Sequence, residues 1–166
     1  MTDFTDNPRC AHRDAAFSDA VITDFSDPVF QAAFREYFAE LGISVSDWAG
    51  LFEEMDQEGG NEAILRRSSE GEIIGFIQYK PIEFQSWFFT ETCGFIREFW
   101  IAERFRRLGH GSQLLKKAET NMLDKGIHTL LLTTYTAAGF YEVHGYVKAP
   151  SCKAKNGDDV FVKRIN

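Results

Sequence analysis

The first half of the chain contains one short apolar run followed by two helical patterns. Residues 20–25 are rich in strand-forming side chains and predict a first strand. Over residues 27–41, apolar positions recur every three or four residues, and an Asp-Pro pair marks the start, so a helix is predicted there. Gly42 is typical of the end of such a helix. A second apolar stripe predicts a shorter helix over 46–58, which a Gly-Gly pair ends.

The second half is organised mainly around strand patterns. Its predicted elements are strands at 63–68 and 73–79 joined by a hairpin turn, a strand at 94–101, a helix at 109–125, a strand at 128–133, a short helix at 137–144, and strands at 145–148 and 159–163. Residues 80–93 either extend the hairpin or form a loop. Residues 1–18 are polar and aperiodic, and we expect a flexible leader there.

The long helix at 109–125 links two predicted strands. Its pattern places Leu115, Ala118 and Met122 on the buried face and Glu119 on the solvent face. A strand, helix and strand in succession predict a parallel pair joined by a right-handed crossover. The length of 166 residues fits one domain, so we expect a single α/β domain over residues 1–166.

Composition and charge narrow the class of function. The formal net charge is −7, which argues against a general nucleic-acid binder because such proteins present basic surfaces. An acidic surface either attracts cationic substrates such as amines or serves solubility alone. No apolar run is long enough to cross a bilayer, and the first residues lack a secretory signal. We therefore expect a cytoplasmic protein with no membrane partner and no nucleic-acid partner.

The cysteines and aromatic residues carry little direct chemistry. Cys10, Cys93 and Cys152 lie far apart without CxxC spacing, so they predict neither a disulfide framework nor a zinc site. No other metal-ligand constellation or nucleophilic triad stands out, and we expect no metal. Sixteen Phe, three Trp and five Tyr are a large aromatic load for filling a core or lining a pocket.

The most informative segment runs from Phe95 to Ser112, where a basic, glycine-containing turn separates a predicted strand from a predicted helix. The free N–H groups and dipole at the start of a helix suit such a turn to an anionic group. A Walker loop does not fit, because Gly109 and Gly111 are too close together and no Gly-Lys-Ser follows. The dinucleotide fingerprint GxGxxG does not fit either, because its third glycine is replaced by Leu114.

The turn does fit another phosphate-loop pattern: Arg or Gln, two residues, Gly, one residue, then Gly or Ala, here Arg106–Gly111. A second motif, Phe140-Tyr141 followed after three residues by Gly145-Tyr146, stands downstream. Together they resemble the pyrophosphate loop and the C-terminal signature of the GNAT N-acetyltransferases, and the element order agrees over residues 20–166. The resemblance implies the GNAT fold: an α/β fold with a mixed, mostly antiparallel sheet, whose central parallel strand pair splays apart, flanked by helices. One departure is Thr134, where many members have Asn.

The resemblance also implies a binding site for acetyl-CoA as co-substrate. In the family, the pantetheine arm inserts between the splayed strands and pairs with the backbone of the first of them. Tyr141 would protonate the leaving thiolate as general acid. The residues that the resemblance assigns to acetyl-CoA are Phe99, Trp100, Ile101, Arg106, Arg107, Leu108, Gly109, His110, Gly111, Ser112, Phe140 and Tyr141. For His110 a backbone contact is expected, and His144 is expected at the surface of the short helix.

The attacking amine must be neutral, so a base, or a water relayed to one, has to remove a proton from it. Glu98 lies within a predicted buried strand, where a carboxylate needs a partner. It is either a general base or one half of an ion pair, and Arg97 is a poor partner because adjacent strand residues point to opposite faces. Whether Glu98 faces the acceptor stays open at this point. Glu83 and Glu91 are alternative bases.

The acceptor is less well defined than the donor. Trp87, Phe88 and Phe89 are consecutive aromatics that cannot all face one core, so they predict a pocket wall or a subunit contact, the latter in a homodimer. The sequence hypothesis is an acetyl-CoA-dependent N-acetyltransferase acting on a primary amine of a small molecule, or on a protein N-terminus or lysine, by direct attack in a ternary complex. The alternative is a catalytically inactive module that binds CoA as a regulatory ligand.

Overall fold

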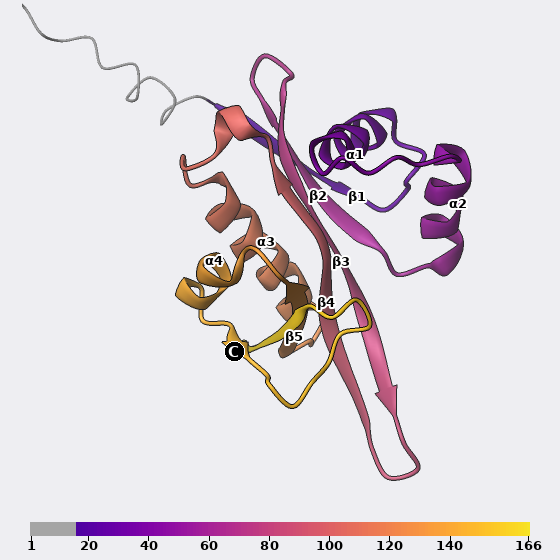
Figure 1. The fold of residues 1–166 in the computed structure, drawn as a ribbon, viewed down its shortest axis with the longest axis vertical. Coiled ribbons are helices and arrows are strands. Elements are labelled where there is room, and N and C mark those ends of the chain that lie inside the picture. Colours follow the sequence, from indigo (N-terminus) through magenta and orange to yellow (C-terminus); the bar gives the residue numbers. More distant parts are fainter. Residues whose placement is uncertain (1–15) are drawn as a thin grey trace, which may run out of the picture.

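A computed structural model describes residues 16–166 as a seven-stranded sheet with helices on both faces (Figure 1). The strand order is β1-β2-β3-β4-β5-β7-β6, and all neighbouring strands are antiparallel except β4 and β5, which are parallel. This confirms the α/β fold with a mixed, mostly antiparallel sheet. The elements are β1 (Phe17–Ile22), α1 (Pro28–Glu40), α2 (Trp48–Glu58), β2 (Glu62–Ser68), β3 (Ile73–Gln85), β4 (Thr90–Ile101), a short 3-10 helix (Glu103–Phe105), α3 (His110–Asp124), β5 (Thr129–Thr134), α4 (Ala138–Val143), β6 (Val147–Lys148) and β7 (Asp159–Arg164).

Two apolar clusters, one on each face of the sheet, form the core. Helices α1 and α2 cover one face, and α3 and α4 lie on the other (Figure 1). The first cluster is mainly aromatic and includes Phe30, Phe34 and Phe76. The second packs Leu114 and Leu115 of α3 against the central strands. Because both faces of the sheet are covered by packed side chains, the backbone of the central strands β4 and β5 is held rigidly.

The helix boundaries follow from local chemistry, as the sequence predicts. Helix α1 begins where the Asp27 carboxylate accepts the N–H groups of Val29 and Phe30 at 2.9 and 2.8 Å. Beyond its end, Gly42 has a φ of 69°, a left-handed conformation that favours glycine. Helix α2 starts two residues later than predicted because the side chain of Asp47 caps it, accepting the N–H of Gly50 at 2.9 Å.

Residues 80–93 do not extend the predicted hairpin of β2 and β3, whose pairing ends at Glu62 and Tyr79. They belong instead to a second hairpin, in which β3 runs on to Gln85 and β4 begins at Thr90 rather than at 94. Strands β3 and β4 stay paired out to Gln85 and Thr90. The turn between them is closed by a hydrogen bond from the Ser86 N–H to the Phe89 carbonyl at 2.8 Å. The resulting arm projects beyond the rest of the sheet (Figure 1).

The first strand differs from its predicted position. It runs over Phe17–Ile22 rather than 20–25, because its pairing with β2 ends at Ile22 opposite Ala63. Phe25 leaves the sheet and is buried against Phe30 of α1. The first residues of the predicted leader lie outside the described part of the chain, whereas its last two residues belong to β1.

Glu119 is the one clear error in the predicted pattern of α3. The side chain is expected in solvent but the residue is only 3% exposed. Its Oε1 accepts the Tyr146 hydroxyl at 3.1 Å and pairs with Lys163 Nζ at 2.7 Å. Tyr146, after α4, and Lys163, on β7, therefore cover the face of α3 that carries Glu119. The periodicity of α3 alone does not indicate that this face is covered.

Three further observations concern residues 16–166. Cys93 is buried and Cys152 is exposed, and both are free; Cys10 lies outside the described residues. No helix in this range is both long and apolar enough to span a membrane. The same range contains no group of three or more His, Cys, Asp or Glu side chains arranged to hold a metal ion.

Candidate active site

The central parallel strands separate, as the resemblance implies. Pairing between β4 and β5 is confined to three positions, from Cys93 opposite Thr129 to Phe95 opposite Leu131. Beyond them β4 continues to Ile101 without a partner on that edge. A cavity of about 710 Å³ lies at this opening, lined by residues of α1, β4, the loop before α3, β5 and α4. The volume falls in the range of small-molecule sites, roughly 300 to 1,000 Å³.

The loop before α3 presents free backbone donors at one end of the cavity. Within the described chain, none of the N–H groups of residues 107–112 donates to a carbonyl or a side chain. Gly109 adopts a φ of 88° and Arg107 a φ of 63°. A positive φ is unfavourable for arginine, so the surrounding structure must hold this strained turn in place. Both residues line the cavity, together with Gly111 and Ser112.

Arg106 has partners within the protein. Its Nε donates to the Ile101 carbonyl at 2.8 Å, and its guanidinium is paired with Glu40 at the end of α1. Glu40 also accepts the indole N–H of Trp100 at 2.8 Å. Arg106 therefore ties the loop to α1 and to β4, and Arg107 is the arginine of the motif with no ion pair in the described structure.

The side chain of His110 points away from the loop into a buried network. His110 Nδ1 lies 3.2 Å from Arg66, which is 2% exposed and forms an ion pair with Asp19 at 2.7 Å. Arg66 also donates to Gln113 of α3 at 2.5 Å. Burial and the charge of Arg66 lower the pKa of His110, while Asp19 opposes them. The network fastens the start of α3 to β1 and β2, and no sequence motif announces it.

The other loop positions contact α4. His144 is half-buried rather than at the surface, because its Nδ1 lies 2.7 Å from the Phe140 carbonyl and its Nε2 lies 2.9 Å from Ser112 Oγ. A Cβ on Gly111 would sit 3.6 Å from the Phe140 ring. Leu108 is partly buried and does not line the cavity.

A β-bulge in β4 sets the direction of the residues beside the opening. Gln78 is opposite Glu98 and Tyr79 is opposite Ile96, so Arg97 is the extra residue. Arg97 and Glu98 consequently both face the side of α1 and α2, where the sequence expects opposite faces. They still do not pair, because Arg97 binds Glu58 instead.

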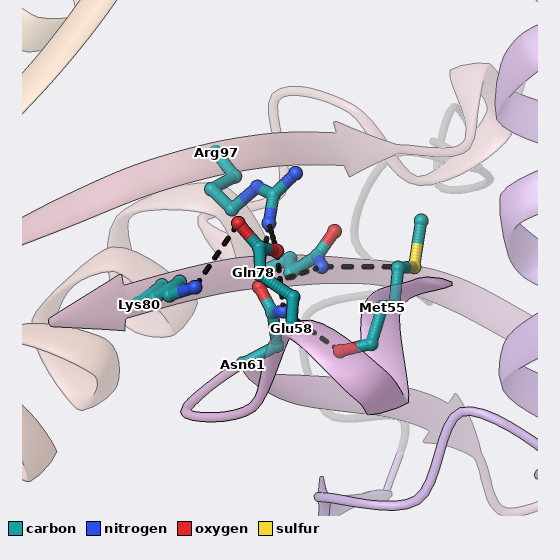
Figure 2. A network of polar contacts seen from close by, with 6 residues as sticks. All are labelled: Met55, Glu58, Asn61, Gln78, Lys80 and Arg97. Atoms are coloured by element: carbon teal, nitrogen blue, oxygen red, sulfur yellow. Dashed lines mark hydrogen bonds and ion pairs between the residues drawn. The ribbon is translucent and has the colours of Figure 1, made fainter. Parts of the chain in front are cut away.

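The bulge is held by a polar network around Glu58 (Figure 2). The Glu58 carboxylate contacts Arg97 at 2.5 Å, Lys80 at 3.0 Å and the side-chain amide of Asn61 at 2.9 Å. The hydrogen bond from Asn61, followed by those from Lys80 and Arg97, lowers the pKa of Glu58 to about 2. The side chain of Gln78 lies beside Glu58 with its Nε2 toward Met55 and Asn61 (Figure 2), and its side-chain carbonyl oxygen is buried without a partner.

Glu98 faces α1, and its charge also acts on Tyr141 of α4. The Tyr37 hydroxyl donates to Glu98 Oε2 at 2.8 Å. Burial raises the pKa of Glu98, and the hydrogen bond from Tyr37 and the charge of Arg97 oppose that shift. Tyr141 is 7% exposed and lines the cavity, and burial followed by the Glu98 charge raises its pKa. Tyr37, a residue that the motifs do not include, also lines the cavity.

The alternative carboxylates and the exposed aromatics lie away from the cavity. Glu83 is exposed on the hairpin arm, and Glu91 accepts the Thr129 hydroxyl at 2.9 Å. Trp87 and Phe88, at the tip of the arm, are 99% and 95% exposed and line no part of the cavity. The prediction that Trp87, Phe88 and Phe89 form a pocket wall is therefore wrong for this cavity, because the hairpin carries them past the body of the sheet. Their alternative role as a subunit contact stays a prediction.

Comparison with known proteins agrees with this geometry. The family model described as acetyltransferase (GNAT) family matches residues 21–146. No curated protein matches the sequence. Among solved structures, a GNAT-family acetyltransferase from Staphylococcus aureus Mu50 is 15% identical, covers 90% of this chain and 100% of its own, and has a TM-score of 0.66.

Two further structures are similar in fold. An acetyltransferase from Clostridium acetobutylicum, solved with acetyl-CoA, is 14% identical, with coverage of 84% of this chain and 95% of its own and a TM-score of 0.70. An aminoglycoside acetyltransferase from an uncultured soil metagenomic sample, solved with trehalose, is 14% identical, with coverage of 77% and 84% and a TM-score of 0.62. Because the family model spans most of the chain and the fold agrees, the protein belongs to the GNAT family of acetyltransferases.

Proposed function

We propose that the protein transfers an acetyl group from acetyl-CoA to a primary amine by direct attack in a ternary complex. The observation that carries this proposal is the unpaired edge of β4 from Ile96 to Ile101, which borders a cavity ending at the free N–H groups before α3. An extended amide-containing ligand can pair with such an edge as an added strand does. A phosphate suits the start of α3.

The residues present fit acetyl-CoA. Backbone groups of Phe99, Trp100 and Ile101 on the open edge are suited to its amides, and one N–H would polarise the thioester carbonyl. The backbone around Gly109 and the side chain of Arg107 are suited to the pyrophosphate. Arg106 acts through position, because its ion pair with Glu40 and its bond to Ile101 hold the loop in place.

Glu98 and Tyr141 have environments that suit them to acid–base roles. Glu98 contacts the cavity-lining Tyr37 and has no ion pair in the described structure, unlike Glu40, which lines the cavity but binds Arg106. Burial raises the pKa of Glu98, which makes it a better proton acceptor near neutral pH. Tyr141 keeps its proton at neutral pH because burial and Glu98 raise its pKa, so it is able to donate that proton to a thiolate. The acceptor is a primary amine of a small molecule, or of a protein N-terminus or lysine.

Binding and turnover test the proposal separately. Acetyl-CoA at about 100 times its Kd is expected to stabilise the protein by about 2.7 kcal/mol, which corresponds to a rise in Tm of roughly 5 to 10 °C. Gly111→Trp should abolish the shift, since the new side chain enters the loop against Phe140. Gly139→Trp is the matched control, because that side chain projects into open space on α4. The absence of a shift in the wild type would refute the donor assignment.

Thiol release with a panel of amines measures transfer itself: an amino acid, a polyamine, an aminoglycoside and a peptide with a free N-terminus. Tyr141→Phe should lower kcat by about 10²- to 10⁴-fold, the usual contribution of a general acid. Unchanged turnover in this variant would remove Tyr141 from the mechanism. Tight acetyl-CoA binding without turnover on any amine would instead favour a regulatory binding module.

A further inference from the structure

Tyr37 links the cavity to Glu98 by a direct hydrogen bond. Its side chain lines the cavity and its hydroxyl donates to Glu98 Oε2 at 2.8 Å. Glu98 is not among the residues of the described chain that line the cavity. The carboxylate that does line the cavity, Glu40, is already engaged by Arg106 and Trp100. Glu98 has instead the hydroxyl of Tyr37 between its Oε2 and the cavity.

Packing fixes the orientation of this hydroxyl. The Tyr37 ring contacts Phe34 of α1 and, across the sheet, Phe76 and Trp100, with ring centroids 6.0, 5.8 and 6.4 Å apart. With Phe38 as a fourth aromatic neighbour at 5.5 Å, the packing restricts the ring to an orientation that directs its hydroxyl toward Glu98. A tyrosine hydroxyl is both a donor and an acceptor. While its hydrogen is directed at Glu98, its oxygen can accept another hydrogen bond.

We propose that Tyr37 is a catalytic residue whose hydroxyl relays the proton of the acceptor amine to Glu98. This rests on the proposed function. The ammonium nitrogen gives a proton to the Tyr37 oxygen as the Tyr37 proton passes to Glu98 Oε2, so the amine becomes neutral and Glu98 becomes protonated. The amine then attacks the thioester carbon, the C–N bond forms and the C–S bond breaks. Tyr141 protonates the thiolate and takes back a proton from the amide nitrogen, and Glu98 releases its proton to water.

The charged and titratable groups around Tyr37 favour a concerted relay. Burial raises the pKa of Tyr37, and so do Glu98, Tyr141 and Glu40. On the other side of Glu98, Arg97 lies close enough to lower the pKa of that carboxyl. A free tyrosinate at Tyr37 is thus strongly disfavoured, and the incoming and outgoing protons must move together. The hydroxyl remains neutral before and after the transfer.

Another buried tyrosine gives a matched control. The Tyr79 hydroxyl donates to Glu62 Oε2 at 3.2 Å, and Tyr79 is on the α3 side of the sheet away from the cavity. Tyr79→Phe removes a buried hydroxyl that is also paired with a carboxylate. If only the loss of such a hydrogen bond mattered, Tyr37→Phe and Tyr79→Phe would affect turnover alike.

The experiment compares kcat and KM for acetyl-CoA, with the best amine of the panel, in the wild type, Tyr37→Phe, Glu98→Gln, the double variant and Tyr79→Phe. We expect Tyr37→Phe and Glu98→Gln each to lower kcat by about 10²- to 10⁴-fold, with KM for acetyl-CoA unchanged. The double variant should be no slower than the slower single variant, because both residues serve one step. Tyr79→Phe should keep the wild-type kcat.

The pH profile separates a relay from a structural role. The deficit of Tyr37→Phe should narrow as the pH approaches the pKa of the amine, about 10 for an alkylamine such as lysine, because the acceptor then arrives without its extra proton. A wild-type kcat in Tyr37→Phe, a deficit independent of pH, or a double variant that multiplies the single losses would each overturn the relay. Thiol release by the wild type distinguishes the two proposals. If the wild type releases no thiol with any amine, both the proposed acetyl transfer and the relay are refuted. If the wild type is active and Tyr37→Phe is equally active, only the relay is refuted.

Discussion

Gly75 is the position where the smallest change should disturb the open strand most. It lies on β3 opposite Ile101, and a Cβ added there would sit 2.3 Å from the Trp100 carbonyl oxygen and 2.9 Å from the Ile101 Cα. Ordinary contact begins at 3.4 Å, so the carbonyl would have to retreat by 3.4 − 2.3 = 1.1 Å. Both atoms are backbone and cannot turn aside as a side chain would. Overpacking of this kind costs roughly 1 to 3 kcal/mol.

Gly75→Ala is therefore expected to lower the free energy of unfolding by about 2 to 3 kcal/mol, at the upper part of that range. For a chain of this size the Tm should fall by about 4 to 12 °C. Urea denaturation measures the loss, and the acetyl-CoA thermal shift should shrink as well because the displaced atoms belong to β4. Gly139→Ala is the control: it has open space around its Cβ on a helix and should be neutral or stabilising by up to about 1 kcal/mol. Equal stability of the two variants would refute the close approach of β3 to β4.

Three further predictions concern other parts of the molecule. Arg66→Met should cost about 1.5 to 3 kcal/mol in urea denaturation, because the buried Asp19 carboxylate loses two hydrogen bonds from Arg66 and keeps only Lys117 as a partner. Arg104→Met removes only half-exposed ion pairs and should cost less than about 1 kcal/mol. Similar losses in the two variants would contradict this contrast. The pKa of Glu58 is lowered to about 2, so its ionised carboxylate stabilises the fold fully above its usual pKa near 4.5, and this contribution is lost as the pH falls toward 2. In Glu58→Gln the fall of Tm over this pH range should be smaller than in the wild type. An unchanged dependence of Tm on pH would count against the network. Trp87→Ser and Phe88→Ser should change stability by less than about 0.5 kcal/mol, since both side chains are almost fully exposed; a larger loss at micromolar concentration, with a change of mass in light scattering, would indicate a self-association surface.

Sequence reasoning located the candidate site because its markers are local. The turn at 102–109 lies between a strand and a helix, and the pair Phe140-Tyr141 lies in a short helix beside the same cavity, as the motifs predict. Side-chain directions were harder to predict. A bulge at Arg97 overrides the strand alternation that predicts Arg97 and Glu98 on opposite faces. Arg106 and His110 match the motif, but their side chains bind protein groups that the motif does not specify.

Local patterns in the sequence predict the order of the elements, the ends of most helices, the hairpin of β2 and β3 and the phosphate-loop turn, because caps, periodicity and glycine turns act over a few residues. Which distant groups meet depends on how these elements pack. Tyr37 and Glu98 are 61 positions apart, and Glu40 and Arg106 are 66 apart. Such pairs depend on how α1 packs across the sheet and on one extra residue in β4. Local patterns leave those choices open, since many partners satisfy the same polar side chain and only the packed core selects one.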